Sequence, residues 1–206
     1  MKKILCFGDS NTFGFIPENG KRYKKNIRWT GILQNLLNDS YQIMEAGCNN
    51  RTAFVDNPFG LEQTGYKVLP KYLEKEFYDV ILFAIGINDL QLFFNPSLNE
   101  FETGMQKLIN IAKSLSQDSK LILVCPPKLD LDGINNGMFR FQFDEKSVEK
   151  SSCLPKIYEK LSNKNNCNFV NLNDIVKVSP IDGLHFSPES HEKIAKYLYK
   201  EISHII

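Results

Sequence analysis

Three polar residues near the two ends of the chain have the types that nucleophilic catalysis needs. Ser10 follows an apolar segment, residues 4–7, and Asp182 and His185 lie three positions apart towards the other end. A serine hydroxyl is a weak nucleophile until a base takes its proton, and a carboxylate can hold a histidine ring in the orientation that makes it such a base. These residues predict attack by Ser10, with His185 as the base and Asp182 as its orienting partner.

Each of these residues also has a structural explanation. A serine at a strand end is commonly a turn former or a helix cap, and an aspartate close to a histidine is commonly a loop hydrogen bond. The other two histidines, His191 and His204, fall in the last predicted helix, so His185 is the only one expected on a loop at a strand end. The catalytic interpretation therefore depends on further residues that complete a site.

Acyl-transfer chemistry needs N–H groups where the negative charge of the oxyanion develops. Asn88 follows the apolar segment 78–85 and can supply its side-chain amide. The backbone N–H groups of Ser10 and of the turn 47–50 can supply the rest. An Asn-Asp pair after a strand is also ordinary turn chemistry, so this assignment requires that the segments meet in space.

The elements that must position these residues alternate between apolar strands and amphipathic helices. Strands are expected at about 3–7, 41–46, 78–85, 121–125 and 168–172, helices at about 28–38, 61–77, 97–116, 145–164 and from 188 onwards, and long loops at 11–28 and 128–145. This alternation predicts a doubly wound three-layer α/β/α sandwich with five parallel strands. The carboxyl ends of parallel strands share one edge of the sheet, where ligands bind, and the candidate residues follow such ends.

Composition narrows the class of protein. The chain has 206 residues, of which 42% are hydrophobic, and this predicts a single domain over residues 1–206. A net charge of +1 without a basic block argues against a nucleic-acid partner. The apolar runs are far shorter than the ~18 residues of a membrane span, and the first one is too short for a secretion signal, so a cytoplasmic location is expected. Five cysteines without metal-ligand spacing predict reduced thiols and no metal site.

Four segments together resemble the SGNH (GDSL-type) esterase/acylhydrolase family. They are Gly8-Asp9-Ser10, Gly47-Cys48-Asn49-Asn50, Gly86-Ile87-Asn88-Asp89 and Asp182-Gly183-Leu184-His185. Three further segments look like the branch that contains bacterial arylesterases and acyltransferase-like members that also make peracids: Gly8-Asp9-Ser10-Asn11-Thr12-Phe13-Gly14, Arg28-Trp29-Thr30-Gly31 and Arg51-Thr52. The order and spacing of these segments cover nearly the whole chain.

The resemblance implies a flavodoxin-like SGNH hydrolase fold and a serine esterase that uses no cofactor. It assigns Ser10 as nucleophile, His185 as general base and then acid, Asp182 as the residue that orients it, and Asn88 as an oxyanion donor. The first segment departs from the family pattern, because Asn11 stands where leucine is often found. This difference is not expected to change the chemistry.

A second departure concerns the oxyanion hole. Family members take a further donor from a backbone N–H of the second segment, usually that of a glycine or alanine. Here that place falls on Asn50, while Gly47 opens the turn and is the other candidate. Asparagine tolerates left-handed backbone geometry, so its N–H can still point correctly, but its side chain would narrow or polarise the pocket.

The predicted function is hydrolysis of short-chain carboxylic esters, with a small-molecule ester as substrate and an acyl-Ser10 intermediate. Transfer of the acyl group to an alcohol or to peroxide is an alternative at the same site. A flavodoxin-like module that binds a phosphate or a flavin at residues 10–14 is an alternative from another class. It would leave His185 and Asn88 without a role.

The aromatic loops leave a further alternative open, an inactive scaffold that uses the phenylalanine-rich segment 138–143 as a protein interface. Taken singly, Phe15 and the aromatic residues of this segment are expected in a core or an interface rather than in a substrate pocket. Together, the long loops are expected to shape a narrow acyl site. A homo-oligomer formed through these loops is also expected.

Overall fold

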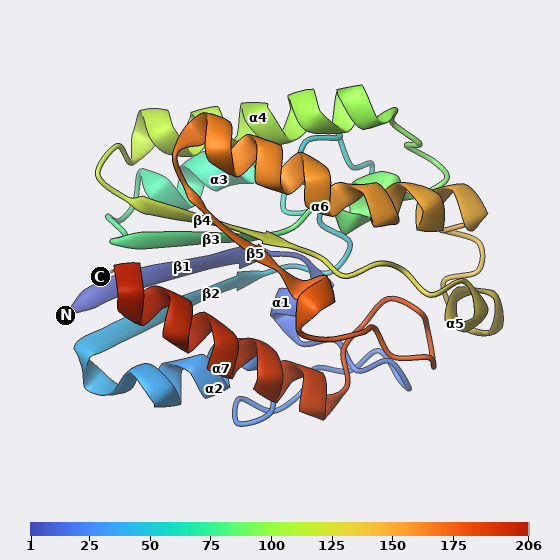
Figure 1. The fold of residues 1–206 in the computed structure, drawn as a ribbon, viewed down its shortest axis with the longest axis horizontal. Coiled ribbons are helices and arrows are strands. Elements are labelled where there is room, and N and C mark those ends of the chain that lie inside the picture. The colour runs from blue at the N-terminus through green and yellow to red at the C-terminus, as the bar shows by residue number, and fades with distance from the viewer. Residues whose placement is uncertain (206) are drawn as a thin grey trace.

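The computed structural model describes residues 1–205 and places a five-stranded parallel sheet between two layers of helices (Figure 1). The strands are β1 (Lys2–Gly8), β2 (Tyr41–Gly47), β3 (Val80–Ala84), β4 (Lys120–Cys125) and β5 (Asn168–Asn171), in the order β2-β1-β3-β4-β5. Every neighbouring pair is parallel. The predicted α/β sandwich with five parallel strands is confirmed.

Seven α-helices lie around the sheet in residues 1–205. They are α1 (Ser10–Phe13), α2 (Trp29–Leu37), α3 (Gly65–Leu73), α4 (Leu98–Leu115), α5 (Leu131–Asn136), α6 (Glu145–Asn165) and α7 (Pro188–Ile205), with short 3-10 helices at Asn38–Ser40, Ile87–Leu90 and Leu172–Asp174. Helices α3, α4 and α6 cover one face, and α2 and α7 cover the other (Figure 1). Within the described residues, no helix has both the length and the apolarity needed to cross a membrane.

Strand β1 is buried on both faces. Leu5 and Phe7 join the core on the α3, α4 and α6 side, whereas Ile4 and Cys6 join the core under α2 and α7. Burial on both sides explains why this strand reads as a continuous apolar run rather than as an alternating one. These four buried residues fix the end of β1, from which the chain continues to Ser10.

The strand order creates a switch point beside β1. From β1 the chain moves to β2 on one side, and it then returns to β3 on the other side of β1. In open α/β sheets, ligands bind in the crevice beyond the strand ends at such a reversal. Ser10 lies just beyond β1 and Asn88 just beyond β3, so the topology brings the two side by side.

The expected loops contain two short helices. Helix α1 takes up the start of the segment 11–28, and α5 lies within the segment 128–145. Both are too short for a 3.6-residue apolar period to be read from sequence. Each begins at an aspartate: the carboxylate of Asp9 accepts the N–H of Asn11 at 2.9 Å, and that of Asp130 accepts the N–H of Gly133 at 2.8 Å.

The helix expected at 61–77 is shorter than predicted. It extends over Gly65–Leu73, and residues 61–64 form a turn instead. Pro70 lies inside α3 without ending it, and its carbonyl accepts the N–H of Glu74 at 2.8 Å. The proline removes one N–H donor from the helix, while packing of Val68 and Leu69 into the core holds the helix in place.

Candidate active site

Ser10 sits at a sharp turn from strand to helix. It is the first residue of α1, and the Asp9 carboxylate, which is buried, caps that helix. A Cβ at Gly8 would lie 2.0 Å from the Thr12 hydroxyl oxygen, so only glycine allows the helix to begin this close to the strand. These contacts give Asp9 a structural role and fix Ser10 at the edge of the sheet.

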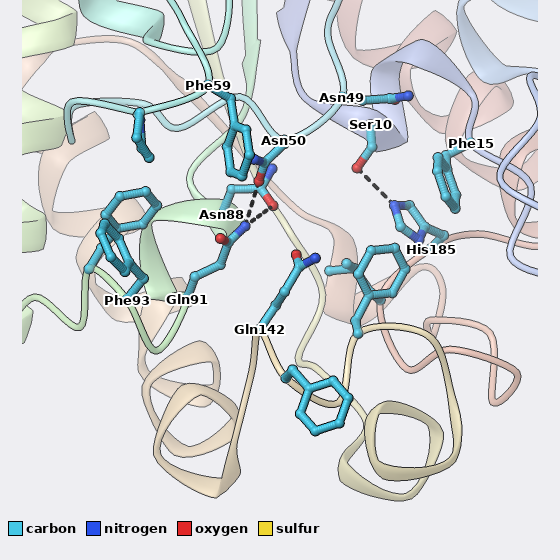
Figure 2. Close-up of a pocket in the computed structure, with 15 residues that line it drawn as sticks. Ser10, Phe15, Asn49, Asn50, Phe59, Asn88, Gln91, Phe93, Gln142 and His185 are labelled. Atoms are coloured by element: carbon cyan, nitrogen blue, oxygen red, sulfur yellow. Dashed lines mark hydrogen bonds between the residues drawn. The ribbon is translucent and has the colours of Figure 1, made fainter.

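His185 connects Ser10 to Asp182. Its Nε2 lies 2.8 Å from the Ser10 Oγ (Figure 2), and its Nδ1 lies 2.7 Å from the Asp182 Oδ2. Because a carboxylate only accepts hydrogen bonds, Nδ1 must carry the proton and Nε2 is free to accept the serine hydroxyl. The structure therefore brings together the three residues predicted as nucleophile, base and orienting group.

Hydrogen bonds keep the Asp182 carboxyl ionised despite its burial. Burial acts to raise its pKa, but the His185 ring and the backbone N–H groups of Leu184 and His185 outweigh that effect, so the pKa of Asp182 lies below its usual value. The two backbone N–H groups donate to its Oδ1 at 3.0 Å. A negative charge next to the ring stabilises the imidazolium that forms when His185 takes a proton.

Two phenylalanines cover the His185 ring. Phe15 stacks on it with ring centroids 4.2 Å apart and an interplanar angle of 23°, and Phe139 lies against it at 5.2 Å. Both rings, and Phe141, line the cavity beside Ser10. Phe15 and Phe141 were expected in a core or an interface but line the cavity, whereas Phe139 lines the cavity and also packs against the core on the α3, α4 and α6 side. Phe15 and Phe139 restrict the positions that the imidazole can take.

The cavity beside Ser10 and His185 has a volume of about 380 Å³ (Figure 2). Its lining comes from several loops: Ser10, Phe15, Asn49, Asn50, Pro58, Phe59, Asn88, Gln91, Phe93, Phe94, Phe139, Phe141, Gln142, Leu184 and His185. None of these described lining residues is an aspartate, glutamate, lysine or arginine. Such a lining suits a neutral, partly apolar ligand.

Asn88 presents a side-chain amide to this cavity. It lies in the 3-10 helix Ile87–Leu90 directly after β3, and its Nδ2 donates one hydrogen to the carbonyl oxygen of Arg51 at 3.1 Å. An amide nitrogen has two hydrogens, so the second can point towards a ligand. Asn88 lines the same cavity as Ser10, and its role as an oxyanion donor stays a prediction.

The two candidates from the second segment lie in different places. Asn50 lines the cavity and has the left-handed backbone angle φ of 61° that asparagine tolerates. Gly47 is the last residue of β2 and is not part of the lining; a Cβ there would lie 2.2 Å from the backbone nitrogen of Phe13. The structure thus puts Asn50 at the cavity and gives Gly47 close packing against α1.

Gln91 was not identified from the sequence. The residue is 6% exposed, and its Nε2 donates to the Oδ1 of Asn50 at 2.7 Å and to the Oδ1 of Asn88 at 3.1 Å (Figure 2). Residues three apart eclipse one another on a 3-10 turn, so the spacing of Asn88 and Gln91 is a signal that could have indicated the contact. No group of three or more His, Cys, Asp or Glu side chains in residues 1–205 could hold a metal ion.

Comparisons with known proteins indicate a family of esterases and acylhydrolases. Residues 6–193 match the GDSL-like lipase/acylhydrolase family. An aryl esterase of M. smegmatis has a TM-score of 0.92 and 25% identity, and a carbohydrate acetylesterase of Sinorhizobium meliloti has a TM-score of 0.91 and 29% identity, each over 100% of both chains. A lipase/acylhydrolase of Enterococcus faecalis shares the fold, with a TM-score of 0.67 and 21% identity over 98% of this chain and 95% of its own.

A search of curated protein sequences finds no match. The family match nevertheless covers most of the chain and includes the segments that carry Ser10, Asn88 and His185. The chain belongs to the GDSL-like lipase/acylhydrolase family.

Proposed function

We propose that the chain hydrolyses short-chain carboxylic esters through a covalent acyl-Ser10 intermediate. The observation that carries this proposal is the hydrogen-bonded series from Asp182 through His185 to Ser10, with distances of 2.7 and 2.8 Å, at the edge of the cavity. Family membership supports ester chemistry. A phosphate- or flavin-binding module would give this series no task.

Acylation starts with the proton of Ser10. His185 Nε2 takes it as Oγ attacks the ester carbonyl carbon, and a tetrahedral intermediate with a negative oxygen forms. The free N–H of Asn88 and the backbone N–H groups of Ser10 and Asn50 are the proposed donors to that oxygen. When the carbon–oxygen bond to the alcohol breaks, His185 returns the proton to the leaving alcohol, and the acyl group stays on Ser10.

Deacylation repeats these steps with water. His185 takes a proton from water, the resulting hydroxide attacks the acyl carbon, and the proton then returns to Ser10 as the acid leaves. Throughout, Asp182 keeps the ring in one tautomer and stabilises its charged form.

The lining of the cavity supports a neutral substrate. A volume of about 380 Å³ must hold both parts of the ester, which favours a short acyl group, and the phenylalanine side chains favour an apolar or aryl alcohol. The names of the two relatives, an aryl esterase and a carbohydrate acetylesterase, agree with small acyl groups and varied alcohols. The apolar lining also limits water, which supports acyl transfer to an added alcohol as a second route.

Substitution of the nucleophile tests the proposal. We expect Ser10→Ala to lower kcat for p-nitrophenyl acetate by on the order of 10⁵-fold, because no covalent intermediate can form. A fluorophosphonate should label wild type at Ser10, located by mass spectrometry, and should not label the variant. Ester produced in the presence of an added alcohol measures the second route in the same assay.

Ser114→Ala is the matched control, since Ser114 is exposed on α4 away from the cavity and its loss should leave kcat unchanged. A Ser10→Ala enzyme that hydrolyses the ester as fast as wild type would overturn the proposal.

A further inference from the structure

Three amide side chains form one hydrogen-bonded network on the cavity wall. The Gln91 Nε2 donates one hydrogen to Asn50 Oδ1 at 2.7 Å and the other to Asn88 Oδ1 at 3.1 Å (Figure 2). Asn88 is 3% exposed and Gln91 6% exposed, so water competes little for these bonds. Both hydrogens of the Gln91 amide are therefore used to hold asparagines that border the cavity.

A backbone carbonyl sets the direction of the whole network. The Arg51 carbonyl can only accept, so Asn88 must turn its Nδ2 towards it, at 3.1 Å. The Oδ1 of Asn88 then faces Gln91, and because this oxygen accepts, Gln91 must donate to it from its Nε2. If the Asn88 amide turned over, two carbonyl oxygens would face each other at Arg51, and two N–H groups would face each other at Gln91.

Arg51 itself is firmly held. Its guanidinium donates to the carbonyl oxygens of Gly8 at 3.1 Å and Ala46 at 2.5 Å, near the ends of the strands β1 and β2. The residue is 1% exposed. The network therefore extends from the sheet through the Arg51 carbonyl to Asn88 and Gln91.

We propose that Gln91 is a positioning residue that keeps the second N–H of Asn88 directed at the oxyanion. This inference rests on the proposed esterase function and on Asn88 as a donor. Gln91 acts on the oxyanion only through Asn88 and Asn50, because both hydrogens of its amide are taken up by them and its amide oxygen is an acceptor, which cannot bind an anion. Without Gln91, the Asn88 amide keeps only the bond to Arg51 and can rotate about it.

Two substitutions test this role in different ways. Gln91→Met keeps the length of the side chain but removes both donors, and we expect kcat to fall about 10-fold. Gln91→Glu keeps the shape but presents only acceptors to two asparagine oxygens, which forces the Asn88 amide to turn or move, and we expect a fall of ~100-fold. The backbone bonds of Gln91 to Asn88, Phe94 and Asn95 do not depend on its side chain, so both variants should fold.

The readouts separate positioning from general stability. If Gln91 orients an oxyanion donor, kcat falls while KM stays within about 3-fold, and a trifluoromethyl ketone, whose adduct with serine carries an oxyanion, loses affinity in parallel with kcat. In an Asn88→Ala background, Gln91→Met should cost much less than it does in wild type, because the group that it positions is gone.

Gln106→Met is the matched control. The Nε2 of Gln106 also donates to two asparagine oxygens, those of Asn110 and Asn165, both at 2.9 Å, on the helices α4 and α6 and outside the cavity. This variant should lower the melting temperature by a similar amount and leave kcat and the inhibitor affinity at their wild-type values.

The possible results are distinguishable. Folded Gln91→Met and Gln91→Glu enzymes with wild-type kcat, or a loss of kcat without loss of inhibitor affinity, overturn the role of Gln91 while the Ser10-dependent esterase stands. Equal costs of Gln91→Met in the wild-type and Asn88→Ala backgrounds also overturn it. A wild-type protein with no Ser10-dependent hydrolysis overturns the proposed function itself.

Discussion

Asn88 divides its two amide hydrogens between the protein and the cavity. One bonds the Arg51 carbonyl, and the other is the proposed oxyanion donor. We expect Asn88→Ala to cost about 3 kcal/mol of transition-state stabilisation, a fall of a few hundredfold in kcat, because the charge on the oxygen develops only after attack. Steady-state kinetics with p-nitrophenyl acetate should show this fall with a much smaller change in KM.

Asn173→Ala serves as the control for Asn88→Ala. The Asn173 side chain also bonds backbone groups, accepting the N–H of Lys128 at 2.8 Å and donating to the carbonyl of Pro126 at 3.4 Å, but it does not line the cavity beside Ser10. It should lower the melting temperature and spare kcat. An equal loss of kcat in both variants would show that Asn88 supports the fold rather than the oxyanion.

The residues that could be predicted from the sequence are those whose type restricts their chemistry. Taken together, a serine, an aspartate and a histidine that follow strand ends have few explanations other than catalysis, so the sequence predicts Ser10, Asp182 and His185 as site residues. Gln91 and Phe15 did not, because a glutamine or phenylalanine at a loop position is compatible with many environments. Their roles come from contacts, a bidentate amide and a stacked ring, that only three-dimensional structure specifies.

Helix α5 supports the turn that carries Asp182 and His185. The N–H of Asp130, the residue that caps α5, donates to the Gly183 carbonyl at 3.0 Å. Gly183 has φ of +68°, the left-handed geometry that glycine adopts without strain. A long loop in a compact domain is often functional, so the sequence predicts that the segment 128–145 shapes the site, but it does not predict that the segment acts through a helix.

Helix α5 and the turn lie against each other at Gly133. A Cβ added there would lie 2.5 Å from the nitrogen and 2.7 Å from the Cα of Gly183, which are backbone atoms that cannot move aside alone. We expect Gly133→Ala to push the turn away and lower kcat about 10-fold or more, since small displacements of catalytic groups are costly. Kinetics and thermal melting of the variant measure both effects.

The change in melting temperature caused by Gly133→Ala shows whether the turn is crowded by the added methyl group. Alanine favours a helix by about 1 kcal/mol over glycine, so Gly133→Ala would stabilise the protein if the turn were not in the way. Asn135→Ala, on an exposed position of α5, provides that comparison and should leave kcat unchanged. A Gly133→Ala enzyme with a higher melting temperature and unchanged kcat would contradict the support that α5 gives to the turn.

At the scale of the whole molecule, the site depends on strand order. The strands β1, β3 and β4 appear in the sequence as continuous apolar runs because they are buried on both faces, and parallel strands put their carboxyl ends on one edge. That β3 rather than β4 neighbours β1 is decided by long-range packing, since Ile81 and Phe83 pair with Leu5 and Phe7. No local pattern encodes such a pairing, although it places Asn88 beside Ser10.

His191 joins the two helices on one face of the sheet. It lies in α7, is fully buried, and its Nδ1 accepts the N–H of Trp29 at the start of α2 at 3.2 Å. Tyr23 and Phe186 contact its ring edge-on. Burial, with a smaller effect of His185, lowers the pKa of His191 from 6.5 to about 3, so the ring is neutral in the folded protein.

This lowered pKa predicts how stability changes with pH. Between about 6.5 and about 3, the unfolded chain binds a proton at His191 that the folded protein does not, so the contribution of His191 to stability is full above pH 6.5 and is lost as the pH falls. Asp9 and Asp89 act in the opposite direction, because burial raises their pKa from 3.8 to about 7 and stability falls as the pH rises through that range.

A comparison of wild type with His191→Asn isolates the contribution of His191 to the pH dependence of stability, since both proteins keep Asp9 and Asp89. The asparagine oxygen can still accept the Trp29 N–H but does not titrate. We expect the free energy of unfolding of wild type, relative to the variant, to decrease by about 3 kcal/mol from about pH 7 to pH 4, as measured by urea denaturation. Parallel stability curves for the two proteins would show that His191 takes up a proton in the folded state as readily as in the unfolded chain.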